Sequence, residues 1–261
     1  MVNKYWLERM AASQAKITEK NRKQLDRQLR KYYMTASKRT IEDFEATYNK
    51  LLSTVEAGRE PTPADLYKLD KYWQAQAQLE NELRKLGNRQ IASISKAFRE
   101  NWFEVYYSIS LESQAAFSTI DDAAVNQLIA QIWCADGKAW SERVWENTKH
   151  LADTLNEELI HCVATGKPSA ELKGILQERF NVSFSQADTL VRTELSHIQT
   201  EAAKKRYQDY GIQEVEILAD ADERRCEICG KLHGKRYPIG ANIPIPSHPR
   251  CRCSIVPVVE I

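Results

Sequence analysis

Five side chains of metal-ligating types lie close together near the C-terminal end of the sequence. They are Cys226, Cys229, His248, Cys251 and Cys253. Two thiols separated by two residues can be presented by one tight turn to a single ion, and His248 and Cys251 have a similar spacing on a second arm. Gly230, directly after the first pair, permits the backbone to bend there. We therefore predict a tetrahedral zinc site with these ligands: Cys226, Cys229, His248 and Cys251.

Cys253 competes for the fourth ligand position. Cys251 and Cys253 alternate in the sequence, so in an extended segment they face opposite sides and cannot easily reach one ion together. His233 is a weaker candidate. A site with four protein ligands is closed, so its expected role is structural. The alternative without metal is a small core of reduced cysteines, or a disulfide that forms only after cell lysis.

Sequence motifs of several enzyme classes are absent. The sequence contains no His-Glu-x-x-His, no Gly-x-Ser-x-Gly and no phosphate-binding Gly-x-x-x-x-Gly-Lys-Ser/Thr. It also lacks the His-x-Glu of zinc deaminases. One enzymatic alternative stays open, a zinc-stabilised nuclease in which Cys253 replaces His248 on the metal. His248 would then act beside an acidic cluster made of Asp220, Asp222 and Glu223.

Basic residues are concentrated between positions 16 and 40, where only Glu19 and Asp26 oppose them. A basic helical face can contact DNA phosphates or an acidic partner. The plainer alternative is a solvated helix face. The candidate binding residues are Lys16, Lys20, Arg22, Lys23, Arg27, Arg30, Lys31, Lys38 and Arg39.

The overall composition limits the class of protein. Thirty-seven basic and 36 acidic residues give a net charge of +1, which excludes a uniformly basic nucleic-acid-binding protein. Apolar residues make up 43% of the chain, enough for a real core. No stretch approaches the roughly 20 apolar residues of a membrane span, and the start lacks the apolar core of a secretory signal. We expect a soluble protein of the cytoplasm, with no membrane partner.

Glycine and proline positions divide the chain into predicted helices. Because neither a glycine nor a proline precedes Gly58, residues 2 to about 57 are expected to form one long helix. A second helix is expected to open at Thr62 or Pro63 and to end at Gly87, and a third is expected from 89 to about 107.

Further along the chain, Asn181-Val182-Ser183 is expected to cap a helix that Gly211 closes. Residues 215–219 and 254–259 have a residue pattern typical of strands. The predicted fold is mainly α, with long N-terminal helices, a helical middle region and a small zinc-stapled α+β C-terminal module. The predicted regions are 1–110, 111–211 and 212–261.

An ordered set of motifs resembles the phage head-morphogenesis family, the Mu F-like minor head proteins of tailed phages and prophages. The motifs are Arg192-Thr193-Glu194, Tyr210-Gly211-Ile212, Asp222-x-Arg224-x-Cys226-x-x-Cys229, Leu232-His233-Gly234-Lys235 and Pro246-x-His248-Pro249-x-Cys251-Arg252-Cys253. The resemblance is strongest over residues 150 to 259. The opening Tyr5-Trp6-x-x-Arg9 is similar to minor capsid proteins of phages of Gram-positive hosts.

The resemblance implies a virion component present in few copies, at the capsid interior or the portal vertex, and in the host cytoplasm during assembly. The implied partners are the portal protein and the major capsid or scaffolding protein, with double-stranded DNA during packaging or ejection. No established catalytic activity is implied. Some members carry a toxin domain such as an ADP-ribosyltransferase beyond the shared region, and we expect none in a chain that stops at Ile261. The remaining alternative is a host metal-containing or DNA-binding regulator.

The retained Arg192-Thr193-Glu194 triplet is interpreted as a polar contact to a partner or to the cysteine loop. Adjacent positions do not face each other on a helix, so a simple ion-pair network explains it less well. We therefore predict a structural clamp in which Arg192 and Glu194 hold the loop containing Asp222 and Arg224.

Overall fold

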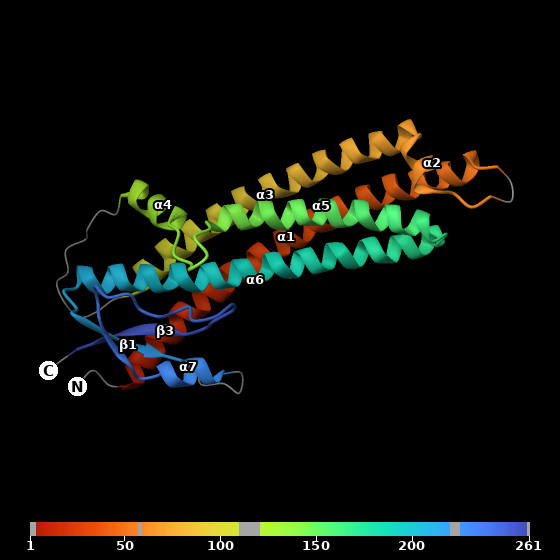
Figure 1. Ribbon diagram of the computed structural model, residues 1–261. Coiled ribbons are helices and arrows are strands. Elements are labelled where there is room, and N and C mark those ends of the chain that lie inside the picture. The colour runs from red at the N-terminus through yellow and green to blue at the C-terminus, as the bar shows by residue number, and fades with distance from the viewer. Residues whose placement is uncertain (1–3, 57–58, 110–120, 220–224, 260–261) are drawn as a thin grey trace. The chain divides into compact units, whose positions relative to one another are not determined.

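The structure is a computed structural model that describes residues 4–56, 59–109, 121–219 and 225–259. These residues form seven helices and three strands (Figure 1). The helices are α1 (Lys4–Thr54), α2 (Pro63–Tyr67), α3 (Asp70–Ser108), α4 (Asp122–Ala130), α5 (Trp140–Ala164), α6 (Ser169–Asp209) and α7 (Glu227–Leu232). The strands are β1 (Glu214–Leu218), β2 (Arg236–Pro238) and β3 (Ser254–Val258). The prediction of a mainly α fold with a small C-terminal β module is confirmed. Within these residues, no helix is long and apolar enough to cross a membrane.

The chain divides into two compact units, each assembled from segments distant in sequence. The first unit comprises Met1–Asp26, Ile94–Trp140 and Asp188–Ile261, and the second comprises Arg27–Ser93 and Ser141–Ala187. Each unit therefore combines residues from more than one of the three predicted sequence regions. The boundaries at 110 and 211 stay a prediction about sequence organisation.

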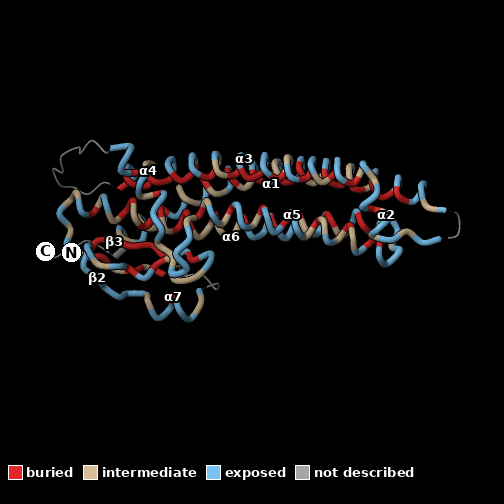
Figure 2. The backbone as a smooth tube through the Cα atoms, turned by 45° about the horizontal axis from the view of Figure 1, so that its top comes forward, coloured by how far each residue is buried: buried red, intermediate tan, exposed pale blue. Residues whose placement is uncertain are grey.

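The core of the second unit is formed by four helices that run side by side (Figure 1). Buried residues recur every three or four positions along each helix, which places them on one inward face (Figure 2). This core includes Phe44 and Tyr48 of α1, Leu79 and Leu83 of α3, Leu151 and Leu155 of α5, and Leu172 and Leu176 of α6. Each fully buried leucine stabilises the fold by roughly 2 kcal/mol.

The prediction that Gly87 ends a helix is wrong, because α3 continues through it to Ser108. A Cβ atom at Gly87 would lie 2.5 Å from Cζ3 of Trp145 on α5. The glycine is therefore a packing residue that lets the indole ring approach the α3 backbone. Its sequence signal is the same as that of a helix C-cap, which explains the error.

The predicted cap at Asn181-Val182-Ser183 is also wrong, since α6 runs unbroken from Ser169 to Asp209. The Asn147 side-chain amide donates to the Ser183 carbonyl oxygen at 3.0 Å, and the Tyr33 hydroxyl lies 3.2 Å from the Ser183 hydroxyl. Ser183 is thus used in a buried polar network between helices of the second unit. The prediction that the helix closes before Gly211 is confirmed, and this glycine has a φ of +75°.

The first unit contains a three-stranded antiparallel sheet with β1 in the centre, between β2 and β3. Its core side packs on the C-terminal half of α6. There the buried Tyr207 hydroxyl donates to the Ile255 carbonyl oxygen at 3.2 Å and accepts from the Gln14 amide of α1 at 3.0 Å. The Gln199 amide donates to the Ser254 hydroxyl at 2.9 Å. These polar contacts fix β3, and the cysteines directly before it, against α6.

Replacing Gly87 with alanine should destabilise the protein by about 1 kcal/mol or more, because the Trp145 ring must leave its position. Gly174→Ala is the matched control in helix α6, where an added Cβ meets nothing within 4 Å. That control should stabilise by up to about 1 kcal/mol through helix propensity alone. Chemical denaturation of both variants measures the difference. Equal stabilisation by the two substitutions would show that Gly87 has no packing role.

Candidate metal centre

The first arm of the candidate metal centre is the start of α7. Cys226 is the N-cap residue of this helix, and its sulfur accepts a hydrogen bond from the Cys229 backbone N–H at 3.4 Å. That hydrogen bond lowers the pKa of the Cys226 thiol below its ordinary value. Cys229 follows in the first turn of α7 and is buried. The local backbone therefore brings both sulfurs together and favours the thiolate form of Cys226, which is the form that binds metal.

The second arm is a tight turn over residues 248 to 251. The Cys251 backbone N–H donates to the His248 carbonyl oxygen at 3.2 Å, and Pro249 occupies the first central position. Arg250 has a φ of +62° at the second central position, where glycine is usually preferred. A non-glycine residue in this conformation costs about 1 kcal/mol. The contacts of Arg250 described below offset that cost.

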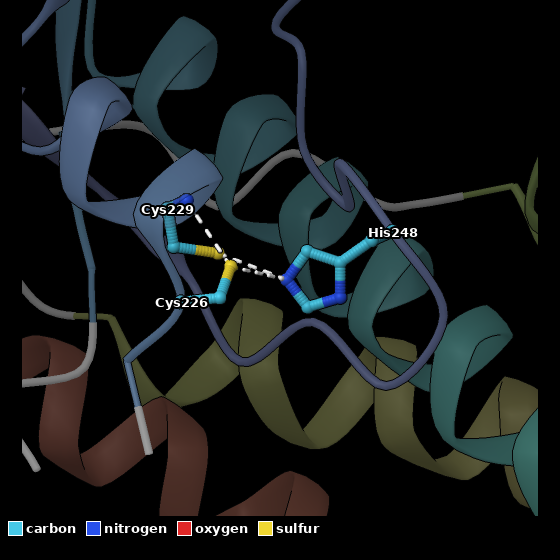
Figure 3. Close-up of side chains that lie close together, drawn as sticks. All are labelled: Cys226, Cys229 and His248. Carbon is cyan, nitrogen blue, oxygen red and sulfur yellow. Dashed lines mark hydrogen bonds between the residues drawn. The ribbon is translucent and has the colours of Figure 1, made fainter. Parts of the chain in front are cut away.

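The two arms bring Cys226, Cys229 and His248 together (Figure 3), while Cys251 groups with Cys229 and Cys253. His248 Nε2 lies 3.3 Å from the Cys226 sulfur and 3.0 Å from the Cys229 sulfur. The Cys229 and Cys251 sulfurs are 3.8 Å apart. Zinc–sulfur bonds of about 2.3 Å at the tetrahedral angle place two sulfurs about 3.8 Å apart. The distance between the Cys229 and Cys251 sulfurs therefore fits two ligands of one zinc ion.

The orientation of the His248 ring also fits a metal ligand. Its Nδ1 lies 2.8 Å from the Pro249 carbonyl oxygen, so an Nδ1–H group donates there. This bond fixes the tautomer that leaves the Nε2 lone pair facing the sulfurs. A second hydrogen bond of this kind is the usual companion of histidine ligands. The residue types present and the direction of the His248 ring thus fit a zinc ion.

The expectation that Cys251 and Cys253 face opposite sides is wrong. The sulfurs of Cys229, Cys251 and Cys253 all lie within 4.8 Å of one another, and Cys229 also belongs to the group with Cys226 and His248. Cys251 and Cys253 precede β3, so the side-to-side alternation of a paired strand does not apply to them. A hydrogen bond with the Cys253 thiol lowers the pKa of Cys251, and the same contact raises the pKa of Cys253. Both thiols therefore lie close to Cys229, and Cys253 stays an alternative to Cys251 as a ligand.

His233, the weaker ligand candidate, lies outside both ligand groups found among the described residues. Its Nδ1 accepts a hydrogen bond from the Ala219 backbone N–H at 3.3 Å. It therefore holds the end of β1 rather than the metal centre.

The Arg192-Thr193-Glu194 triplet contacts the cysteine loop through its middle residue. The Arg250 backbone N–H donates to the Thr193 hydroxyl at 3.1 Å, and the Arg250 guanidinium donates to Thr189 Oγ1 at 3.0 Å. Arg192 donates to Asp188 at 2.8 Å, and Glu194 accepts from the Trp133 indole at 2.8 Å. The predicted clamp partners Asp222 and Arg224 lie outside the described residues. Their pairing with Arg192 and Glu194 stays a prediction.

Asp188 is a functional residue that the sequence reasoning missed. Its side chain is 12% exposed, and it forms ion pairs with Arg192, Arg250 and, at 3.6 Å, Arg22 of α1. Only the i,i+4 spacing of Asp188 and Arg192 is visible in the sequence. The other two partners lie far away in the chain, so spacing could not identify them.

The nine candidate basic residues between positions 16 and 40 of α1 divide between the two units. All are exposed except Arg22, which is half-buried. In the first unit Lys20 pairs with Glu104 at 3.1 Å, and both Arg22 and Lys23 pair with Glu19. In the second unit Arg39 pairs with Glu82 at 3.0 Å, Lys38 pairs with Glu42, and the Arg30 guanidinium lies over the Phe184 ring. Part of this positive charge is therefore already balanced by carboxylates.

A comparison with known protein families identifies the segment that contains this centre. Residues 153–256 match the family described as Phage Mu protein F like protein. This part of the chain is similar to that family. The match includes the C-terminal part of α5, all of α6, β1 and β2, the start of β3 and every candidate ligand. The predicted resemblance to the phage head-morphogenesis family is confirmed, and it indicates a phage head protein that associates with the virion.

The chain is also similar to a protein from Enterococcus faecalis (strain ATCC 700802 / V583) named NAD(+)–arginine ADP-ribosyltransferase EFV. The two are 24% identical over 187 residues. The alignment covers 64% of this chain and 38% of the relative, so the chain spans well under half of that protein. No solved structure matches the chain.

Substituting Cys229 with serine should abolish the binding of one equivalent of zinc, because both ligand groups share this residue. Cys251→Ser should have the same effect, whereas Cys253→Ser should keep most of the metal. Cys134→Ser, outside the cluster, is the matched control and should keep a full equivalent. Elemental analysis of the purified, reduced proteins measures the zinc content. Full retention of zinc by Cys229→Ser, or selective loss in Cys253→Ser, would contradict this ligand assignment.

Proposed function

We propose that this protein is a minor head protein of a tailed phage or prophage, bound to the portal and to the inner face of the capsid. The observation that carries the proposal is the family match over residues 153–256, which coincides with the metal centre and with its attachment to α6. The partners that we propose are the portal protein and the major capsid or scaffolding protein. In this proposal the protein acts in capsid assembly, DNA packaging or DNA ejection.

The candidate metal centre has a structural role in this proposal. Cys226, Cys229, His248 and Cys251 would hold the ion, which supplies tetrahedral crosslinking and no substrate chemistry when bound. These residues join α7 to the segment before β3. The sheet has strands of five, three and five residues, which is too small to supply a stable core by itself. The metal would complete that module and keep its outer surface in one conformation for assembly.

We propose no enzymatic step for this chain. His248 Nε2 is directed at two sulfurs, which is the arrangement of a ligand rather than of the general base that a nuclease needs. Its proposed acidic neighbours Asp220, Asp222 and Glu223 lie outside the described residues. The enzyme name of the Enterococcus relative belongs to a protein of which this chain spans 38%.

The portal protein should co-purify with the zinc-loaded chain. Both proteins, produced together and separated by size, should elute as one complex with one equivalent of zinc per chain. Cys229→Ser should weaken this complex by about ten-fold or more if the module forms part of the interface, and Cys134→Ser should leave it unchanged. Failure of the wild-type protein to bind portal would overturn the proposed association. A zinc-free but folded wild-type protein would instead overturn the structural role of the metal.

The chain should transfer no ADP-ribose to arginine-containing acceptor proteins in the presence of NAD. Incorporation of labelled ADP-ribose, with a known arginine-specific transferase as the positive control, measures this. Transfer above the background of the heat-denatured chain would contradict the proposal and shift it toward an effector enzyme.

A further inference from the structure

A groove in the first unit gathers arginine side chains from four separate segments of the chain. It has a volume of about 820 Å³ and lies between α1, the C-terminal half of α6 and the residues around the cysteines. The arginines that line it are Arg22, Arg192, Arg225, Arg250 and Arg252. Two glutamates, Glu8 and Glu19, also line it, so positive charge is in excess.

All the cationic lining residues described for this groove are arginines, with no lysine among them. This contrasts with the outer side of α1, where Lys16, Lys20 and Lys23 are exposed. A guanidinium presents five N–H donors in a planar fork that matches the oxygen atoms of phosphate, while an ammonium acts as a point charge. The choice of arginine therefore points to recognition of oxyanions by directed hydrogen bonds.

Three of these arginines are held in place by one carboxylate. Asp188 pairs with Arg192 at 2.8 Å, with Arg250 at 3.2 Å and with Arg22 at 3.6 Å. Arg22 also forms a two-point contact with Glu19, at 2.7 and 2.8 Å. Such contacts fix the guanidinium groups before a ligand arrives, which reduces the entropy lost on binding. Arg225, Arg250 and Arg252 are exposed and can meet a large ligand.

The remaining lining of the groove favours one class of polyanion. Ala11, Ala12 and Ala15 form the wall on α1, and no phenylalanine, tyrosine or tryptophan is among the described lining residues. Proteins that bind single-stranded nucleic acid use aromatic rings to stack bases. Protein partners usually need an apolar, aromatic-rich contact centre. An arginine-lined groove without phenylalanine, tyrosine or tryptophan suits a ligand that presents phosphates and keeps its bases stacked.

We propose that this arginine groove binds the phosphate backbone of double-stranded DNA. The inference deepens the proposed head function, because it assigns DNA contact to the groove rather than to the exposed lysine side of α1. It also separates two groups within the predicted basic segment. Arg22 belongs to the groove, and Lys16 and Lys20 belong to the outer side of the helix. Binding through phosphates is independent of sequence and weakens steeply with salt.

The test measures the affinity of the full-length, zinc-loaded chain for a short fluorescent duplex of mixed sequence across a range of salt concentrations. The groove variant is Arg225→Ala/Arg252→Ala, and the matched control is Lys16→Ala/Lys20→Ala, which removes two exposed cations from the same unit. The groove variant should bind at least ten-fold more weakly. Its slope of log K against log salt should be smaller in magnitude by about two, because each lost phosphate contact removes about 0.9. The control should change affinity less than three-fold.

Several outcomes would overturn the inference. They are no binding of the duplex by the wild-type chain at low salt, unchanged binding by the groove variant, or an equal loss in the control. A polyglutamate peptide that displaces the duplex at equal charge concentration would reassign the groove to an acidic protein. Zinc content and portal co-purification of the groove variant confirm that it is folded. If the wild-type chain binds portal but not DNA, the groove inference fails and the proposed head function stands. The failure of the inference can therefore be distinguished from the failure of the proposed function.

Discussion

The hydrogen bond from the Arg250 backbone N–H to Thr193 on α6 is the contact on which the candidate metal centre depends. It holds the turn that carries His248 and Cys251, and this turn contains a non-glycine residue with a φ of +62°. Without support from α6, that conformation would be unfavourable by about 1 kcal/mol. The guanidinium of the same residue adds contacts to Thr189 and Asp188. One arm of the metal centre is therefore positioned by a helix rather than by the small sheet.

This dependence explains how a module with so little sheet can bring ligands from two separate segments of the chain close together. β3 is held by Gln199 and Tyr207 of α6, and the turn before it is held by Thr193, about four helical turns before Tyr207 on the same helix. The other arm, at the start of α7, is shaped by its own N-cap hydrogen bond. A bound zinc ion would join the two arms, and structural zinc sites contribute on the order of 10 kcal/mol. The helix and the metal thus have complementary roles.

The sequence predicts those features that depend on local periodicity or on short spacing. The 51-residue α1 follows from the absence of glycine and proline, and the ligand types follow from the Cys-x-x-Cys and His-x-x-Cys spacings. Features that depend on long-range packing could not be read in the same way. Gly87 resembles a helix stop but makes room for Trp145, and Ser183 resembles a cap but joins a buried network. Asp188 has no local signal for its contacts with Arg22 and Arg250.

The metal centre and the arginine groove share one residue, Arg250, so a change in one site affects the other. Arg250 lies between His248 and Cys251 in the sequence, so a metal that fixes these two ligands also fixes the backbone from which the guanidinium extends. Asp188 then sets the position of that guanidinium beside Arg192 and Arg22. An arginine at this strained position is therefore understandable. Glycine would ease the turn and keep the backbone bond to Thr193, but it would remove the side-chain contacts with Thr189 and Asp188 and a cation of the groove. The unfavourable backbone conformation is tolerated because one side chain connects two sites.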